Sequence, residues 1–283
     1  MKPLLTIITI NLNNAAGLKK TLKSVSIQTS KDFEYIVIDG GSTDGSVEII
    51  KQYQNCLTYW VTEPDTGIYQ AMNKGILQAK GNYCQFLNSG DYLLTPYVTE
   101  HMLTNIPLNC SILYGNQIRT KNGKHHVERS YKGRQITLLD LYHSTIFHSC
   151  AYIKRSLFNT YGLYDESLKI VSDWKFYLIV VGLYNEPVCY KNINVVWFDI
   201  TGISSTNKAL NKIERRFVLE QVLPKSILLD YQSLAIDSII INRLKENTLS
   251  WFFVINLYRI TFWYDKLLLR LSCMKPKSSL NKD

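Results

Sequence analysis

A chain of 283 residues, 46% hydrophobic and 19% charged, can build one large domain or two small ones and is too apolar to be globally disordered. Its net charge of +9 favours anionic partners such as nucleotide sugars, phospholipids or nucleic acid.

Targeting signals and paired cysteines are missing from the sequence. No stretch reaches the roughly 18 consecutive apolar residues of a transmembrane helix, and residues 1–10 lack a signal-peptide pattern. The six cysteines are scattered without CxxC spacing, which is typical of a reducing compartment. We therefore expect a cytoplasmic protein.

The first 90 residues alternate between strand-like and helix-like segments. Apolar β-rich runs predict strands over residues 4–10, 33–38, 57–61 and 83–87, and the segments between them predict helices over 17–27, 46–53 and 68–79. Repeated β-α-β units predict an α/β fold with a mostly parallel central sheet flanked by helices.

The rhythm changes after residue 91. The sequence predicts a helix over 96–104, two strands over 111–120 and 124–129 joined by an Asn-Gly turn, a helix over 173–181, a strand over 190–198 and a long helical region from 207. We divide the chain into a nucleotide-sugar half (1–109), an acceptor and catalytic half of the same domain (110–206), and a C-terminal helical extension (207–283).

The extension combines apolar and basic residues. Residues 251–271 are mostly aromatic or aliphatic, and Asn256, Arg259, Lys266 and Arg270 fall on one helical stripe. Eight Lys or Arg and three Asp or Glu after residue 240 give this end of the chain +5 of the total charge. The pattern fits a helix lying on a membrane surface, and it fits equally a helix packed on the catalytic domain or a second subunit.

Polar residues end the first two predicted strands, at the sheet edge where open α/β folds bind ligands. Thr9 and Asn11 end the first strand, and Asp39 ends the second before a Gly-Gly-Ser-Thr-Asp-Gly loop. They can bind a base or ribose. Turn formation and helix capping explain the same residues.

Residues 63–75 place an acid and a flexible glycine at a helix entrance. Asp65 can reach a base or sugar, and Asn73 and Lys74 follow one to two turns into the helix, where the lysine can neutralise phosphate. The alternative is an amphipathic helix with an ordinary cap, although Thr66-Gly67 makes the entrance more irregular than a cap requires.

The segment Asn88-Ser89-Gly90-Asp91 follows the fourth predicted strand. A departing diphosphate needs its charge neutralised, and Mg²⁺ or Mn²⁺ does this with one or two carboxylates and substrate oxygens. Asp91 is the candidate metal ligand, with Asn88 beside the donor. A polar β-turn is the alternative reading.

Together these segments carry a resemblance. Residues 4–92 are similar to the nucleotide-binding half of the family 2 glycosyltransferases, inverting enzymes with the Rossmann-like GT-A fold. The resemblance implies that Asp39 binds a uracil-type base, that Asp65 lies near the nucleoside, and that Asp91 binds the metal. Asn88 stands where the family's DxD motif has its first carboxylate, which leaves metal dependence less firmly implied.

The second half resembles the acceptor side of the same family, over residues 147–153, 162–166 and 170–174. The resemblance implies that Asp173 is the catalytic base, although Ser172 replaces the acid that often precedes it, and a helix N-cap is the alternative role. Trp174 can stack on a sugar. His148 can contact substrate or fill the core. Ser204 lies in a loop that either closes over the diphosphate or caps a helix.

We therefore expect an inverting glycosyltransferase that uses a divalent metal, Mn²⁺ or Mg²⁺, and a nucleotide sugar, with UDP favoured. The predicted acceptor is a glycan or lipid-linked glycan of surface polysaccharide biosynthesis, at the inner face of the cytoplasmic membrane. A nucleotidyltransferase and an inactive nucleotide-sugar-binding protein are the alternatives. Nucleic-acid binding is disfavoured, because the basic excess lies on an apolar helix and no DNA or RNA module is apparent.

Overall fold

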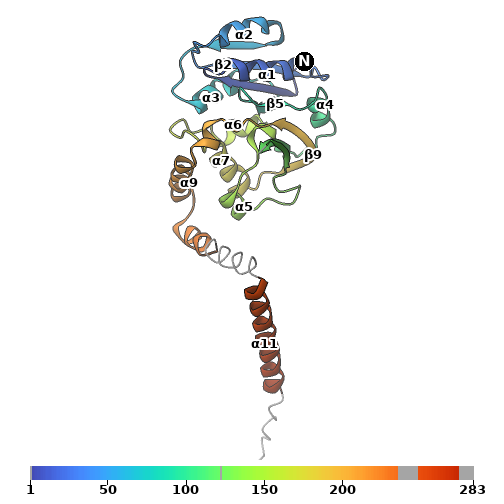
Figure 1. The fold of residues 1–283 in the computed structure, drawn as a ribbon, viewed down its shortest axis with the longest axis vertical. Coiled ribbons are helices and arrows are strands. Elements are labelled where there is room, and N and C mark those ends of the chain that lie inside the picture. The colour runs from blue at the N-terminus through green and yellow to red at the C-terminus, as the bar shows by residue number, and fades with distance from the viewer. Residues whose placement is uncertain (1, 122, 235–247, 274–283) are drawn as a thin grey trace, which may run out of the picture. The chain divides into compact units, whose positions relative to one another are not determined.

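The computed structural model describes residues 2–121, 123–234 and 248–273. The chain divides into two compact units, Met1–Val222 and Leu223–Asp283 (Figure 1). The first unit holds a nine-stranded sheet of order β3-β2-β1-β4-β8-β6-β9-β5, with β7 paired to β6. Helices flank this sheet, so the predicted α/β fold is confirmed.

The N-terminal part of the first unit is a parallel β-α layer. Its elements are β1 (Leu5–Asn11), α1 (Ala15–Ser26), β2 (Phe33–Asp39), α2 (Ser46–Gln52), η1 (Gln54–Cys56), β3 (Tyr59–Thr62), α3 (Ile68–Gln78) and β4 (Tyr83–Phe86). β1 pairs in parallel with β2 and β4, and β2 pairs with β3, as the alternating pattern predicted. Every residue of β1 is buried, which explains why its sequence is a continuous β-rich run.

Helix α3 packs directly against β1. A Cβ atom on Gly75 would lie 2.5 Å from Cγ2 of Ile8, so this close approach requires glycine. The packing fixes the position of α3, whose first turn carries Tyr69.

The second part of the unit adds antiparallel strands. Its elements are β5 (Tyr92–Leu93), α4 (Val98–Leu103), β6 (Ile112–Lys121), β7 (Lys124–Glu128), α5 (Leu138–His143), η2 (His148–Cys150), β8 (Ala151–Lys154), α6 (Ser156–Tyr161), α7 (Ser172–Tyr177), η3 (Leu178–Leu183), β9 (Val188–Trp197), α8 (Ile203–Thr206) and α9 (Lys208–Val222). β8 pairs antiparallel with β4 and β6, whereas β9 pairs in parallel with β6. The sheet is therefore parallel over β3-β2-β1-β4 and mixed beyond it.

Two predicted elements of this part need comment. The Asn-Gly hairpin is confirmed, because β6 and β7 pair antiparallel up to Lys121 and Lys124. The helix predicted over 173–181 exists, but its α-helical part ends at Tyr177 and the chain continues as the π-helix η3.

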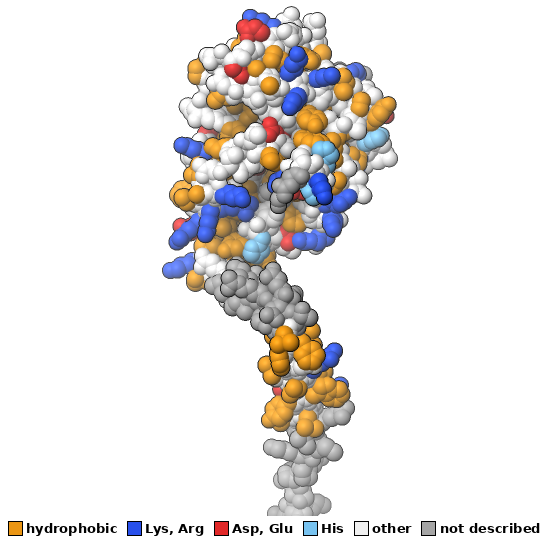
Figure 2. All heavy atoms as spheres, viewed as in Figure 1, with side chains coloured by type: hydrophobic (Ala, Val, Ile, Leu, Met, Phe, Trp, Pro, Cys, Tyr) orange, Lys and Arg blue, Asp and Glu red, His pale blue; other side chains and the backbone are white. Residues whose placement is uncertain are grey.

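The described part of the second unit includes one long helix, α11 (Thr248–Cys273). Its exposed side chains are mainly apolar, among them Phe253, Leu257 and Ile260, and hydrophobic side chains cover most of its visible face in Figure 2. The side chain of Arg270, part of the predicted basic stripe, lies outside the described residues. Among the described residues, no helix is both long and apolar enough to cross a bilayer.

Candidate active site

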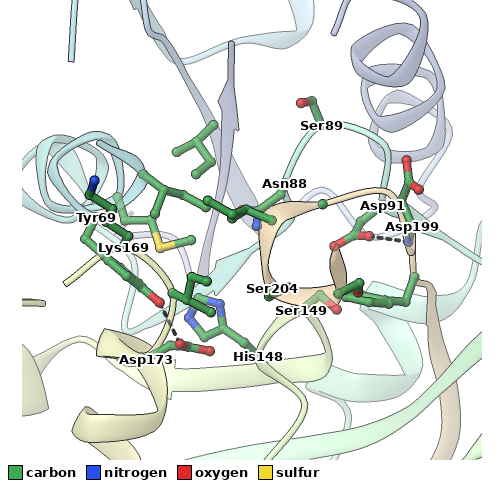
Figure 3. Close-up of a pocket in the computed structure, with 18 of the residues that line it drawn as sticks. Tyr69, Asn88, Ser89, Asp91, His148, Ser149, Lys169, Asp173, Asp199 and Ser204 are labelled. Atoms are coloured by element: carbon green, nitrogen blue, oxygen red, sulfur yellow. Dashed lines mark hydrogen bonds between the residues drawn. The ribbon is translucent and has the colours of Figure 1, made fainter. Parts of the chain in front are cut away.

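A cavity of about 770 Å³ opens at the carboxyl ends of β1, β4 and β9 (Figure 3). Helices complete its wall: the first turns of α3 and α7, the short helix α8, and residues of α9. The cavity thus lies where an open α/β sheet binds ligands, and most of the predicted site residues meet there. Eight of them line it: Asn11, Asp65, Asn88, Asp91, His148, Asp173, Trp174 and Ser204.

Asp39 is fully buried, and groups of the protein itself supply the hydrogen bonds to its carboxylate. Its Oδ1 accepts hydrogen bonds from Asn11 (2.7 Å) and from the Ser42 hydroxyl (2.6 Å). Its Oδ2 accepts from the Ser42 amide (2.9 Å) and the Thr62 hydroxyl (2.6 Å). Burial raises the pKa of Asp39, but these hydrogen bonds outweigh burial and lower it. Asp39 therefore holds the loop after β2 in shape, and its predicted contact with a base stays a prediction.

Asn11 connects this network to the cavity. Its amide nitrogen is bound to Asp39, whereas its buried Oδ1 has no hydrogen-bond partner among the described residues. Buried polar atoms rarely stay unpaired, so this oxygen is available to a ligand donor.

Two predicted donor contacts lie outside the lining. The hydroxyl of Thr9 is buried, 3.0 Å from the hydroxyl of Tyr35. The Asn73 amide donates to the Tyr164 carbonyl and to Glu166, both at 2.8 Å, and so ties α3 to the loop before α7. Both side chains are hydrogen-bonded within the protein, and their predicted contacts with the donor stay predictions.

Lys74 also lies outside the lining, in an ion-pair cluster. Its Nζ is 2.5 Å from Asp65 Oδ1 and 2.7 Å from Glu63 Oε1. Asp65 itself lines the cavity. The structure thus shows Lys74 as the partner that positions Asp65, and its predicted contact with a diphosphate stays a prediction.

Asp91 and Asp199, the Asp91–Asp199 pair, lie next to each other on one side of the cavity (Figure 3). Oδ1 of Asp91 accepts a hydrogen bond from the backbone N–H of Asp199 at 2.8 Å. Burial raises the pKa of Asp91 to about 8, and although this hydrogen bond lowers it, the nearby Asp199 carboxylate raises it further. Unlike Asp39, Asp91 lacks enough protein donors to offset its burial.

Gly90 permits this pair to form. Its φ of +107° favours glycine, and a Cβ atom there would lie 2.5 Å from Asp199 Oδ2. Asn88 adds a third oxygen, because its buried Oδ1 has no hydrogen-bond partner among the described residues.

These three side chains fit a divalent metal. Within the described ranges, no group of three His, Cys, Asp or Glu side chains gathers as a metal site. Mg²⁺ and Mn²⁺, however, are commonly held by one or two carboxylates together with waters and substrate phosphates. Asp91 and Asp199, with the unpaired oxygen of Asn88, supply that oxygen donor set.

Asp173 stands on the opposite side of the cavity from this pair (Figure 3). It is the second residue of α7, and its Oδ1 accepts a hydrogen bond from the Tyr69 hydroxyl at 2.8 Å. Burial and the Asp173 carboxylate raise the pKa of Tyr69 well above its usual value, so the phenol remains a donor. No hydrogen bond to the second oxygen of Asp173 forms within the described part of the chain. One oxygen is thus fixed and the other can accept a proton from a ligand.

The remaining predicted contacts form the walls around Asp173. His148 stacks on Phe86 with ring centroids 4.8 Å apart, and its Nε2 lies 2.8 Å from the Tyr164 hydroxyl. Burial lowers the pKa of His148, partly offset by Asp173, so the ring is neutral. Trp174 is buried and donates to the Leu141 carbonyl at 2.7 Å. Ser204 lies in α8 at the cavity mouth.

The cavity residues that sequence reasoning missed include Tyr69, Lys169, Asp199 and Arg215. Asp199 lies two residues after the end of β9 and directly follows the strand predicted over 190–198, so a polar residue after a predicted strand was the available signal. Tyr69 lies inside the segment that carries the family resemblance. Arg215 gave no signal, because only the packing of α9 brings it to the cavity.

Comparisons with known proteins agree with this geometry. The model of the family described as "Glycosyl transferase family 2" matches residues 6–165. A protein of Mycobacterium tuberculosis named as an uncharacterized glycosyltransferase is 31% identical over 214 residues, covering 72% of this chain and 78% of that protein.

Two solved structures share the fold. TarS 1–349 of S. aureus in complex with UDP-GlcNAc matches with a TM-score of 0.62 at 19% identity, covering 78% of this chain and 68% of that one. In another crystal structure of the same fragment, this chain spans 59% of that chain's length. Glucosyl-3-phosphoglycerate synthase of Mycobacterium tuberculosis, solved with Mn²⁺, UDP and glucosyl-3-phosphoglycerate, matches with a TM-score of 0.53 at 13% identity, covering 79% and 82%.

A family model that spans more than half of the chain, a relative at 31% identity and a GT-A-type fold lead to one conclusion. The chain belongs to glycosyl transferase family 2 and is a glycosyltransferase.

Proposed function

We propose that this protein transfers a sugar from a UDP-sugar, with inversion, to a hydroxyl of a glycan or lipid-linked glycan in surface polysaccharide biosynthesis. The observation that carries the proposal is the placement of Asp173 across the cavity from the Asp91–Asp199 pair (Figure 3). Residues 1–109 supply most of the donor side, and residues 110–206 supply the base and the acceptor side. UDP is favoured because UDP and UDP-GlcNAc are the ligands in the S. aureus structures.

In the proposed reaction, a hydroxyl of the acceptor attacks the donor sugar on the side of the cavity that holds Asp173. The acceptor oxygen forms a bond to the anomeric carbon while the bond from that carbon to the diphosphate oxygen breaks, and its electron pair leaves with UDP. The free oxygen of Asp173 takes the proton of the attacking hydroxyl. The Tyr69 hydroxyl holds the other oxygen and so orients the carboxylate. Attack from the face opposite the leaving group inverts the anomeric centre.

Asp165 is a poorer candidate for the base. Its Oδ2 is 2.6 Å from Lys175 Nζ, and its Oδ1 accepts from the Ser167 amide and hydroxyl. The contact with the Ser167 hydroxyl holds Asp165 in the turn before α7, and Asp165 is not among the residues that line the cavity. The geometry thus favours Asp173.

The opposite side of the cavity receives the leaving group. Asp91, Asp199 and Asn88 would hold a divalent metal, which when bound neutralises negative charge on the departing diphosphate. The unpaired oxygen of Asn11 and the carboxylate of Asp65 face the same cavity and would orient the nucleoside.

A donor screen tests the proposal. The full chain is incubated with UDP-, GDP- and dTDP-sugars in Mn²⁺, Mg²⁺ or EDTA, and released nucleotide is measured. Proton NMR at early times identifies the anomer of any sugar transferred to water. We expect UDP release from one sugar that EDTA abolishes, and a β-anomer from an α-linked donor.

Other outcomes of this screen contradict the proposal. A retained anomer rules out inversion. Pyrophosphate release from a nucleoside triphosphate would instead support a nucleotidyltransferase. Binding of a UDP-sugar with neither hydrolysis nor transfer to any acceptor would support an inactive binding protein. If no nucleotide raises the melting temperature, the nucleotide site itself is wrong.

We also propose that α11 lies on an anionic membrane surface, where a lipid-linked acceptor would be found. The exposed apolar residues of the helix and the cations Arg259 and Lys266 support this, because an apolar helix with a few cations suits an anionic membrane surface. The doubly charge-reversed variant Arg259→Glu/Lys266→Glu should lose binding to phosphatidylglycerol vesicles. The matched control is Lys208→Glu/Lys212→Glu in α9. Equal effects of the two variants would contradict the membrane role.

A further inference from the structure

The base side of the cavity carries two cations, Lys169 and Arg215, that the proposed transfer reaction does not use. Both residues line the cavity, and Asp173 is the carboxylate whose charge acts on Arg215. They therefore belong to the side where the acceptor enters, across from the Asp91–Asp199 pair.

A buried carboxylate brings the two cations together. Glu214 is 8% exposed and accepts hydrogen bonds from the backbone amides of Lys169 (2.8 Å) and Ile170 (2.9 Å). This contact ties α9 to the segment before α7, so that Arg215, the next residue of α9, lies in the same wall as Lys169.

Arg215 is held in place but is not neutralised. Its guanidinium lies 4.4 Å from the centroid of the Trp174 ring, and its Nη2 donates to the Ser144 carbonyl at 3.1 Å. Burial lowers the pKa of Arg215 and Asp173 raises it, and an arginine keeps its charge under such shifts. Of its five N–H donors, one makes a hydrogen bond to another described residue.

Two partly buried lysines of the unit have carboxylate partners, whereas Lys191 and Arg155 donate to backbone carbonyls. Lys74 pairs with Asp65 and Lys175 with Asp165, at 2.5 and 2.6 Å. Within the described residues, neither Lys169 nor Arg215 makes an ion pair. Lys169 is exposed, whereas Arg215 is half-buried. A half-buried charge without a counterion is costly, and an anionic ligand at Arg215 would offset that cost.

We propose that the acceptor carries an anionic group, a phosphate or a carboxylate, which Arg215 and Lys169 bind beside the reacting hydroxyl. This inference rests on the proposed function, because it assigns Asp173 to the acceptor side. A guanidinium stacked on an aromatic ring and open on its edge is suited to the paired oxygens of such a group. The group thus selects the acceptor and orients its hydroxyl toward Asp173.

Calorimetric titration of the full chain tests this proposal. The donor site is first saturated with UDP and Mn²⁺, so that added anions cannot occupy the diphosphate position. Glucose 6-phosphate, glucuronate and glucose are then titrated at constant ionic strength, which separates phosphate, carboxylate and neutral probes. The variants are Arg215→Gln, Arg215→Lys and the matched control Arg216→Gln, whose side chain is exposed and pairs with Glu220.

We expect at least one anionic probe to bind about tenfold or more tightly than glucose, and Arg215→Gln to remove that preference. Arg215→Lys should keep part of it and Arg216→Gln all of it. If Arg215→Gln does not fold, Lys169→Gln takes its place and should weaken the anion about threefold or more.

Two results overturn the proposal: anions that bind no better than glucose, or anions that bind Arg215→Gln as tightly as the wild type. Failure of the proposed function is seen separately, as wild-type protein that binds no UDP in the first step.

Discussion

Asp39 and Asp91 are two aspartates at the same edge of one sheet, and they differ in how many hydrogen bonds the protein donates to their carboxylates. Both are almost fully buried, at 0% and 4% exposure. Asp39 accepts four hydrogen bonds from the protein, and its pKa falls. Asp91 accepts one on its carboxylate and lies beside Asp199, and its pKa rises to about 8.

We propose that this difference separates scaffold residues from ligand-binding residues. The charge on the carboxylate of Asp39 is stabilised by hydrogen bonds from N–H and O–H groups, as is expected of a residue that shapes a loop. The carboxylate of Asp91 has an acidic neighbour in place of a donor, which is stable only when a proton or a cation is supplied. Unsatisfied charge, more than motif membership, therefore marks the residues that bind ligands.

The largest effect is expected at Asp173. In Asp173→Asn the side chain keeps its shape and its contact with Tyr69, but it can no longer accept a proton from the acceptor. We expect transfer to fall by about 10²- to 10⁴-fold. UDP affinity, measured by titration, should change little. Near-normal turnover by this variant would remove Asp173 from the reaction.

Asp91→Asn tests the aspartate that we propose binds a metal. Loss of the charge should lower metal-dependent turnover by about a hundredfold or more. The melting temperature of the metal-free protein at pH 7 should hardly change, because Asp91 with a pKa of about 8 is mostly neutral there already. A large drop in melting temperature would mean that Asp91 is a scaffold residue like Asp39.

Asp39→Asn tests the aspartate whose carboxylate is hydrogen-bonded by the protein. The amide NH₂ group of the asparagine is a donor and cannot accept the hydrogen bonds that one carboxylate oxygen accepted. We therefore expect a loss of about 2 kcal/mol in the free energy of unfolding. Because the pKa of Asp39 is lowered on folding, its contribution is present above about pH 4 and is lost as the pH falls. Denaturant unfolding of both proteins between pH 3 and 7 should show a smaller acid-induced loss in the variant. Identical pH profiles would contradict this assignment.

The smallest effect is expected at Gly90. A methyl group in Gly90→Ala meets Oδ2 of Asp199, so the pair is pushed apart and Mn²⁺ affinity should fall about tenfold. Gly162→Ala is the matched control, because Gly162 has a φ of +91° and open space around its Cβ position. If both variants lose the same metal affinity, backbone strain and not the Asp91–Asp199 contact is responsible.

Much of the fold could be predicted from sequence, because its signals are local. The continuous apolar runs of β1 and β2 and the Asn-Gly turn after β6 each determine structure within about ten residues. β5 could not be predicted in this way, since a strand of two residues is too short to show a period. β8 was also missed, although it is as long as β3 and β4.

The site could be predicted only in part, for the same physical reason. Asp91 was singled out by its place after a predicted strand and Asp173 by family resemblance, and both line the cavity. Asp199 lies 108 residues from Asp91 in sequence, and only the pairing of β9 with β5 and β6 brings it there. Conversely, Lys74 was predicted to contact phosphate because its charge is visible in the sequence, whereas its ion pair with Asp65 depends on the loop before α3.

The measurement that tests the central claim most directly is Mn²⁺ binding followed by electron paramagnetic resonance in the presence of UDP. Wild-type protein and Asp39→Asn should each bind one Mn²⁺ ion with similar affinity, whereas Asp91→Asn and Asp199→Asn should both lose it. Equal Mn²⁺ binding by the wild type and the Asp91→Asn variant would contradict the account, because the unsatisfied carboxylate pair would then have no cation to hold.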